Sequence, residues 1–442
     1  TPTSCQTPLT SAVAPLMKIA LFHNYYKQPG GEDTMFELEI EALRAHGHEV
    51  LPYAVRNSET LSKNNLSQKI RTALNAPHSY SSEIAISKFL AKHRPDISHV
   101  HNWFPNLSPS IFTAHHDAGV PIVQTLHNYR LACAGGNYQR NGQSCQACRP
   151  GYNLPAIRHR CYKNSTAGSI AWKRIMDRGW QNGTFRNLVS HYISPSREVR
   201  RKHIEMGIAP QQITHVPNAC PDPRSISRAT GTNHSAAVQS VCFVGRFVAE
   251  KGAHILVRAW QKLSSAQRRQ RRLILIGTGP QEAMLHELAA GDDSIHFTGQ
   301  LKHQATLRTL QQADLLVSPS LWAEPFGLSV IEAMGAGIPV ISSQLGGPAE
   351  VISDGIDGHL LPAGNIDALS KTLLQCLNAP EQLQAMGRAA RLKYVQHYSP
   401  HRHAQQLTDC FQQVLTPGQT RAAATGTPAE VSASAFALNP SV

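Results

Sequence analysis

Short apolar runs alternate along the chain with longer segments of helical period. The runs lie at residues 17–22, 48–52, 97–101, 121–126 and 191–194 in the first half, and at 240–244, 273–276, 295–297, 315–317 and 340–342 in the second. Runs of this length, rich in Val, Ile and Leu and separated by helical stretches, are typical of strands in parallel sheets. The sequence therefore predicts an α/β protein with two Rossmann-like domains.

Breaks in this pattern divide the chain into parts. Residues 224–239 are polar and hold too little apolar content for a core, which predicts a linker or long loop at a domain boundary. The predicted parts are disordered ends at 1–16 and 418–442, an N-terminal domain at 17–223, the linker at 224–239, a C-terminal domain at 240–400, and a helix at 401–417 that packs back on the first domain. Because ligands bind at the carboxyl ends of such sheets, we expect the site in a central cleft between the domains.

The composition excludes several classes of protein. The chain has 442 residues, of which 41% are hydrophobic and 16% charged, a balance that fits globular domains and excludes a disordered or fibrous chain. Its apolar runs are far shorter than the ~20 residues that span a bilayer. Residues 1–16 lack the basic-then-apolar order of a signal peptide, so we expect a cytoplasmic protein.

Positive charge is concentrated in one part of the chain. The net charge is +13, and residues 130–202 hold fourteen Lys or Arg against two acidic residues, Asp177 and Glu198. Such a block predicts an anionic partner, which could be a phosphorylated substrate, an acidic lipid surface or a nucleic acid. A solvated basic face without a partner is the alternative.

Four of the nine cysteines lie in a basic insertion at about 130–165. Cys133, Cys145, Cys148 and Cys161 have the spacing C-x11-C-x2-C-x12-C, and a C-x-x-C pair with one more thiol on either side matches a structural zinc site. Four unligated thiols in an irregular insertion are the alternative. The odd total of cysteines argues against a secreted disulfide framework.

Residues 168–180 allow two interpretations. Ile170, Ala171, Ile175 and Trp180 alternate with basic residues, as in helices that lie on anionic membranes, and a lipid-diphosphate acceptor would suit such a helix. The alternative is a helix that turns its apolar face to the core and its basic face outward.

One motif in the C-terminal half suits a diphosphate. Gly245, Arg246 and Lys251 follow the predicted strand 240–244 and open a helix. A strand-to-helix turn offers free backbone N–H groups, and two cations beside them add fixed positive charge. Gly277 and Gly30-Gly31 mark weaker glycine turns, each of which alone is more often a chance turn than a phosphate site. No G-x-G-x-x-G follows the first strand and no P-loop motif occurs, which disfavours dinucleotide oxidoreductases and P-loop NTPases.

A pair of glutamates forms the most specific pattern. Glu324 precedes a predicted short helix with Pro325 in its first turn and Gly335 or Gly337 at its end, and Glu332 lies on that helix. Eight residues correspond to about 12 Å of helical rise. Two carboxylates so far apart cannot share a proton, but they could hold hydroxyls at the two ends of an elongated ligand. A surface helix with two solvated glutamates is the alternative.

Residues 17 to about 415 resemble the family-4 (group 1) retaining glycosyltransferases of the GT-B fold. The resemblance rests on Gly30-Gly31, on Thr-Leu-His127-Asn128 at a strand end, on Gly-Arg246-x4-Lys251-Gly and on Glu324-x7-Glu332. It implies a hexosyltransferase that moves a sugar from a UDP- or GDP-linked donor to a glycan or lipid-linked acceptor, in the synthesis of a surface polysaccharide. Residues 17–223 would then be the acceptor-side domain and residues 240–400 the nucleotide-sugar-binding domain.

The same resemblance implies roles for particular residues. Arg246 and Lys251 would hold the diphosphate, Glu332 the ribose hydroxyls and Glu324 the sugar hydroxyls, with His127 beside the sugar. The implied catalytic residues are His127, Glu324, Arg246 and Lys251, and the implied donor-binding residues are Gly30, Gly31, Gly245, Arg246, Lys251, Gly277, Phe326, Gly327, Leu328 and Glu332. No D-x-D triplet occurs, so we expect catalysis without a metal or other cofactor.

The sequence is also compatible with other functions. Within the same fold, a nucleotide-sugar epimerase or a sugar phosphorylase would use similar residues. In another class, the basic segment and a zinc site would suit a nucleic-acid-binding protein, but Glu324 and Glu332 would then have no role. We therefore expect no nucleic-acid partner, and a location in the cytoplasm, peripheral on the inner face of the membrane.

Overall fold

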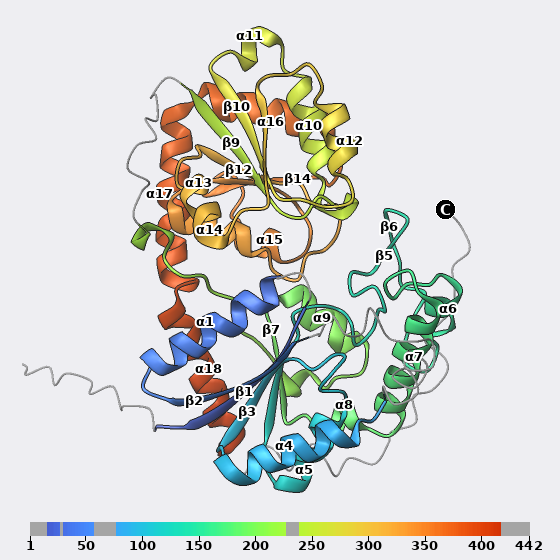
Figure 1. Ribbon diagram of the computed structural model, residues 1–442. Helices are drawn as coiled ribbons and strands as arrows, with labels where there is room; N and C mark the ends of the chain where they lie inside the picture. Colours follow the sequence, from blue (N-terminus) through green and yellow to red (C-terminus); the bar gives the residue numbers. More distant parts are fainter. Residues whose placement is uncertain (1–15, 27–29, 57–76, 227–237, 417–442) are drawn as a thin grey trace, which may run out of the picture.

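The computed structural model describes residues 16–26, 30–56, 77–226 and 238–416. They form two α/β domains, each built on a parallel sheet of six strands (Figure 1). The predicted fold class is therefore confirmed. The expected disordered ends lie outside the described residues, except for residue 16, as does most of the expected linker.

The N-terminal sheet has the strand order β2-β1-β3-β4-β7-β8. Its strands are β1 (Lys18–Tyr25), β2 (Glu49–Arg56), β3 (Ile97–Asn102), β4 (Ile122–Thr125), β7 (His191–Ser194) and β8 (Ile213–His215). The helices around it are α1 (Gly31–Ala45), α4 (Tyr80–His93), α5 (Ser110–Ala118), α7 (Thr166–Gln181), α8 (Thr184–Asn187) and α9 (Arg197–Glu205). Strand β1 is buried along almost its whole length because helices cover both faces of the sheet.

The C-terminal sheet has the order β11-β10-β9-β12-β13-β14. Its strands are β9 (Gln239–Val244), β10 (Arg271–Ile276), β11 (Ile295–Gly299), β12 (Leu315–Ser318), β13 (Val340–Ser343) and β14 (Gly358–Leu361). Its helices are α10 (Ala253–Gln261), α11 (Ser265–Arg268), α12 (Glu282–Leu288), α13 (His303–Leu310), α14 (Leu328–Ala336), α15 (Gly346–Val351), α16 (Ile366–Asn378) and α17 (Pro380–His397). The strand order reverses between β9 and β12, which is where a doubly wound sheet binds ligands.

The last described helix, α18 (Pro400–Leu415), returns to the N-terminal domain, where it lies beside α1 (Figure 1). Ala404, Leu407 and Phe411 are buried there in one core cluster with residues of β1 and α1. The chain thus links its two domains twice, once through residues 216–238 and once through α17 and α18.

Helix α7 turns its apolar face inward. Trp172, Ile175, Met176 and Trp180 are buried, and the two indole N–H groups donate to backbone carbonyls of the loop after β4. The interpretation of this helix as one that inserts its apolar face into a membrane is therefore wrong, and the core-facing alternative holds. No helix among the described residues is both long enough and apolar enough to cross a bilayer.

The cysteine-containing insertion has little regular structure. It consists of the two-residue strands β5 (Gln139–Arg140) and β6 (Gln143–Ser144), which pair with each other, followed by the one-turn helix α6 (Leu154–Arg158). It lies between β4 and α7 on one side of the N-terminal sheet (Figure 1).

Candidate functional site

Glycines bring the loops after three C-terminal strands into direct contact. A Cβ on Gly277, after β10, would lie 1.9 Å from the carbonyl oxygen of Gly245, and one on Gly252 would lie 2.0 Å from that of Pro319, after β12. Both glycines also have positive φ, 145° and 72°. No other residue fits such an approach. The glycines therefore close the backbone around the point where the sheet order reverses.

The predicted cations lie on the first of these loops. Arg246 is exposed and forms no ion pair with another described residue. The ammonium of Lys251 lies 2.7 Å from one carboxylate oxygen of the buried Glu324, and the hydroxyl of Ser320 donates to the other oxygen. The structure thus unites Lys251 with Glu324 at the carboxyl ends of β9 and β12. This arrangement offers positive charge and a fixed hydrogen-bond acceptor to one ligand.

Glu332 also has a partner. It lies buried on α14, and one of its carboxylate oxygens is 2.7 Å from Nε2 of His303 on α13. The hydrogen bond with Glu332 raises the pKa of His303, although burial works against the shift. His303 did not figure in the sequence analysis, because it lies 29 residues away in a helix without a recognisable motif.

The start of α14 differs from the sequence prediction. The helix begins at Leu328, after Gly327 with φ 88°, so that Pro325 stands in the preceding loop and not in the first helical turn. Gly337, with φ 82°, ends the helix as one of the two expected residues. Phe326 is buried, and its backbone lies against Gly347 of α15, where a Cβ would have no room. This contact holds the loop that carries Glu324 against α15. The chain between Glu324 and Glu332 is therefore first a loop and then a helix.

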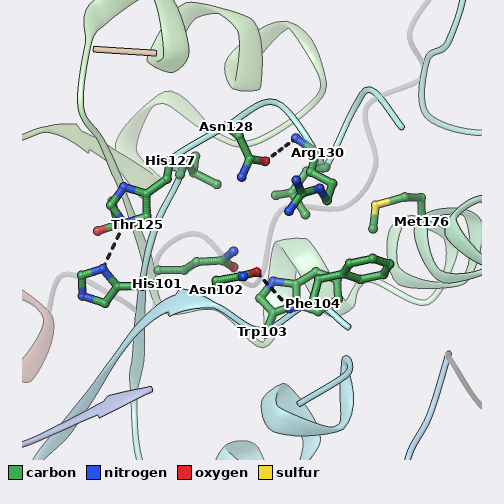
Figure 2. A pocket seen from close by; sticks show the side chains of 12 residues that line it. His101, Asn102, Trp103, Phe104, Thr125, His127, Asn128, Arg130 and Met176 are labelled. Carbon is green, nitrogen blue, oxygen red and sulfur yellow. Dashed lines mark hydrogen bonds between the residues drawn. The ribbon is translucent and has the colours of Figure 1, made fainter. Parts of the chain in front are cut away.

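A second concave site lies in the N-terminal domain, at the carboxyl ends of β3 and β4 (Figure 2). Its wall includes His101, Asn102, Trp103, Phe104, Thr125, His127, Asn128, Arg130 and Met176. Asn128 organises one side of it: its carbonyl oxygen accepts the backbone N–H of Arg130 at 2.8 Å, and its amide donates to Glu32 at the start of α1. The Arg130 guanidinium donates to the hydroxyl of Tyr26 at 2.5 Å. We call this site the N-terminal pocket.

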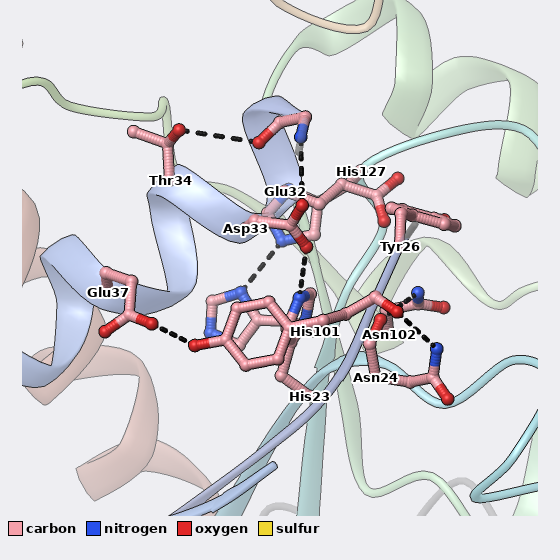
Figure 3. Close-up of polar contacts among 12 residues, drawn as sticks. His23, Asn24, Tyr26, Glu32, Asp33, Thr34, Glu37, His101, Asn102 and His127 are labelled. Carbon is pink, nitrogen blue, oxygen red and sulfur yellow. Dashed lines mark hydrogen bonds and ion pairs between the residues drawn. The ribbon is translucent and has the colours of Figure 1, made fainter. Parts of the chain in front are cut away.

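Behind His127 lies a buried network of imidazoles (Figure 3). Nε2 of His127 is 3.0 Å from Nδ1 of His101, and the two rings stack. One oxygen of Glu39 contacts His101 and His99 at 3.1 and 3.0 Å, while the other contacts His403 of α18 at 3.0 Å. Burial and His101 lower the pKa of His127 well below its ordinary value. His127 is therefore a neutral imidazole near pH 7, oriented by its hydrogen bond with His101.

Glu39, His99 and His101 also have the spacing of metal ligands, since one donor atom from each lies within 4.8 Å of the other two. Protein groups occupy their remaining atoms: His99 contacts Thr125 at 2.7 Å, His101 contacts His127 and Glu39 contacts His403. Burial raises the pKa of Glu39, but the adjacent His101 and His99 outweigh it and hold the pKa well below its usual value. The cluster connects the ring of His127 to α1 and α18.

The two domains touch through loops that follow their strands. A Cβ on Gly31 would lie 3.0 Å from the side chain of Leu328, so the first glycine turn reaches the start of α14. The hydroxyl of Tyr129, after β4, donates to the carbonyl of Ala323 at 3.1 Å. Glu350 of α15 accepts the backbone N–H groups of Arg197 and Glu198, both at 2.8 Å. The carboxyl ends of the two sheets therefore face each other.

These contacts group the predicted residues into two sets. Gly245, Arg246, Lys251, Gly277, Glu324, Phe326, Gly327, Leu328 and Glu332 belong to the C-terminal domain, whereas Gly30, Gly31 and His127 belong to the N-terminal one. Gly31 and Leu328 meet directly. Gly30 has no neighbour within 4 Å of its Cβ position, and its N–H donates to Asp33 at 2.9 Å. Sequence reasoning did not find Glu39, His99, His101 and His403, which are far apart in the chain.

Two Rossmann-like domains joined in this way define the GT-B class of glycosyltransferases. Anabaena Alr3699/HepE, solved with UDP and glucose, is similar over 90% of this chain and 99% of its own, with 18% identity and a TM-score of 0.62. A sucrose-phosphate synthase from Thermosynechococcus elongatus is similar over 90% of this chain and 98% of its own, with 21% identity and a TM-score of 0.64. These likenesses show the fold.

The chain belongs to the group 1, family 4 glycosyltransferases. The family described as "Glycosyltransferase Family 4" matches residues 29–222, and "Glycosyl transferases group 1" matches residues 233–393. The family that the sequence motifs indicated is thereby confirmed.

Curated relatives match parts of the chain. A phosphatidyl-myo-inositol mannosyltransferase of Mycobacterium leprae is 30% identical over 41% of this chain and 48% of its own length. A GDP-mannose-dependent monoacylated alpha-(1-6)-phosphatidylinositol monomannoside mannosyltransferase of Corynebacterium glutamicum is 28% identical over 48% of this chain and 56% of its own. The matched regions thus span about half the length of these relatives.

Proposed function

We propose that the protein is a retaining hexosyltransferase that uses a nucleoside-diphosphate sugar without a divalent metal. The observation that carries this proposal is the ion pair of Lys251 with the buried Glu324, beside the exposed Arg246 and at the reversal point of the C-terminal sheet. At this point one donor could place its diphosphate against the cation and its sugar against the fixed carboxylate.

The charges suit the reaction. Cleavage of a bond between a sugar carbon and a diphosphate develops negative charge on the leaving group, and preorganised cations stabilise it. In this proposal Arg246 and Lys251 supply those cations in place of a metal. Glu324 accepts hydrogen bonds from sugar hydroxyls and Glu332 from ribose hydroxyls, the latter held in place by His303. The acceptor hydroxyl attacks from the same face, and its proton passes to the leaving phosphate.

The N-terminal pocket supports the second half of the proposal, which concerns the acceptor. It holds the partly buried Arg130 and the neutral His127 close to the loop that touches the C-terminal domain. A glycan or lipid-linked acceptor would place its hydroxyl near His127. Since the names of two relatives include phosphatidylinositol acceptors, we propose a lipid-linked or polysaccharide acceptor and action at the inner face of the membrane.

Ligand-dependent thermal stability tests the donor site. The protein is heated with UDP, GDP, ADP and their common sugars in the presence of EDTA. A ligand at 100 times its Kd stabilises the native state by about 2.7 kcal/mol, which is easily measured. We expect a shift with one nucleoside diphosphate, UDP or GDP, and its loss in Arg246→Ala and Glu332→Ala. The matched control is Arg258→Ala, which removes an exposed arginine from α10 of the same domain.

Two results would contradict the proposal. A thermal shift that requires Mn²⁺ or Mg²⁺ would show that donor binding depends on a metal. The absence of any shift would show that the protein does not bind a nucleotide-sugar donor. Product analysis with a labelled donor sugar separates a transferase from an epimerase or a phosphorylase. Salt-dependent binding of duplex DNA in place of a nucleotide would favour the nucleic-acid alternative.

A further inference from the structure

The four cysteines of the insertion surround one small cavity. Cys133 follows the loop after β4, Cys145 and Cys148 lie between β6 and α6, and Cys161 follows α6, yet all four line the same hollow. Each is partly buried and none is in a disulfide. Four other cysteines in the described part of the chain are buried elsewhere: Cys220, Cys242, Cys376 and Cys410. Among these eight described cysteines, only the four of the insertion share a site.

The insertion lacks a core that could hold its fold. Between residues 133 and 165, all of which the structure describes, the fully buried apolar side chains are Ala134 and Ala156. Five residues of this stretch have positive φ without being glycine: Tyr138, Asn141, Arg160, Lys163 and Asn164. Such conformations need external support. Segments too small to bury a core commonly rely on a metal or disulfide crosslink.

We propose that Cys133, Cys145, Cys148 and Cys161 bind one structural zinc ion. Four sulfurs, with one C-x-x-C pair among them, suit the tetrahedral preference and the softness of zinc. Within the described residues the one set of donor atoms already within metal-ligand spacing is that of Glu39, His99 and His101. The four sulfurs line one cavity but lie farther apart than that spacing, so binding of the metal requires them to move together. His159 lines the same cavity, but its ring nitrogen contacts Arg140.

This zinc site would hold a contact between the domains. The amide of Gln139, within the insertion, donates to the carbonyl of Leu321, which lies three residues before Glu324. The ring of Tyr138 packs on Tyr129, whose hydroxyl donates to Ala323. The metal-bound insertion would thus brace the loop that carries Glu324 from the acceptor side.

Metal analysis of the full chain tests the proposal. The protein is purified without metal-affinity resin, chelator or added zinc, and its metals are measured by mass spectrometry. We expect about one zinc per chain. Less than about 0.2 equivalents overturns the proposal, because structural sites bind tightly. Iron in place of zinc also overturns it.

Variants locate the metal. Cys145→Ser/Cys148→Ser is expected to lose the zinc, whereas Cys376→Ala, which removes a buried thiol in α16, is expected to keep it. Retention of zinc by the double variant would place the metal elsewhere, for example at Glu39, and overturn the assignment. If the double variant does not fold, the wild-type protein serves: an organomercurial should release the zinc, and the denatured, chelated chain should show nine free thiols. A count lower by four would indicate two disulfides and overturn the proposal.

Discussion

The two sides of the site are built by different means. On the proposed donor side, backbone contacts set the geometry: Gly252 and Gly277 let the loops approach until a Cβ would overlap a carbonyl oxygen, and Arg246 stands exposed on one of these loops. On the proposed acceptor side, side chains set it: His127 is held by His101, which is held by Glu39. The donor side should therefore be sensitive to side-chain volume, and the acceptor side to protonation.

The largest expected effect is that of acid on the N-terminal domain. Burial lowers the pKa of His101, His115, His191 and His203 to about 4. An unfolded histidine takes up its proton near pH 6.5, so stability is present above that pH and is lost as the pH falls toward 4. At about 1.4 kcal/mol per unit of pKa, we expect a loss on the order of 5 kcal/mol. Hydrogen exchange at pH 7.5 and 5.0, corrected for intrinsic rates, measures it peptide by peptide.

The C-terminal domain provides the internal control. Its His303 has a raised pKa because of Glu332, so its contribution is present at low pH and is lost as the pH rises through that pKa. His254, with a pKa lowered by burial, works in the opposite direction, but it is one residue against at least the four named in the N-terminal domain. An equal acid-induced loss of protection in both domains would contradict the proposed difference between the two sides.

A single methyl group tests the donor side. Gly252→Ala places a Cβ 2.0 Å from the carbonyl oxygen of Pro319 at φ 72°. Backbone strain and overpacking together should lower the free energy of unfolding by about 3 kcal/mol and abolish donor binding. Gly291→Ala is the matched control: its φ is 80°, but nothing lies within 4 Å of the Cβ position, so about 1 kcal/mol is expected. Urea denaturation compares the two variants, and equal losses would show that the close approach does not matter.

The same contrast explains what the sequence could predict. Arg246 and Lys251 are five residues apart on one turn, and Glu324 and Glu332 flank one helix start, so short motifs mark the donor side. The network behind His127 joins Glu39 of α1 to His403 of α18, 364 residues apart, and no local pattern indicates such a contact. The sequence analysis also lacked strands β8 and β14, which are three and four residues long and lie at sheet edges. Tertiary contacts, not local periodicity, determine such elements.

Removal of one charge tests the acceptor-side network. Glu39→Gln replaces a carboxylate that faces three imidazoles with an amide that accepts through one atom only. We expect a loss of about 2 kcal/mol in stability. Because His127 loses its orientation, kcat should fall while the KM for the donor stays unchanged. Glu41→Gln, at an exposed position of the same helix, is the control. A change in donor KM without a change in kcat would mean that the network does not position His127.

The smallest expected effect concerns a single proton. Asn128 accepts from the backbone of Arg130 and donates to Glu32, and only an amide does both near pH 7. Asn128→Asp keeps the shape but sets two carboxylates against each other, at a cost of about 1 kcal/mol in the free energy of unfolding. Glu32→Gln in the same chain restores a donor opposite the new acceptor, so the double variant should recover most of the loss. A double-mutant cycle by urea denaturation gives the coupling directly, and additive losses would show that these two side chains do not depend on each other.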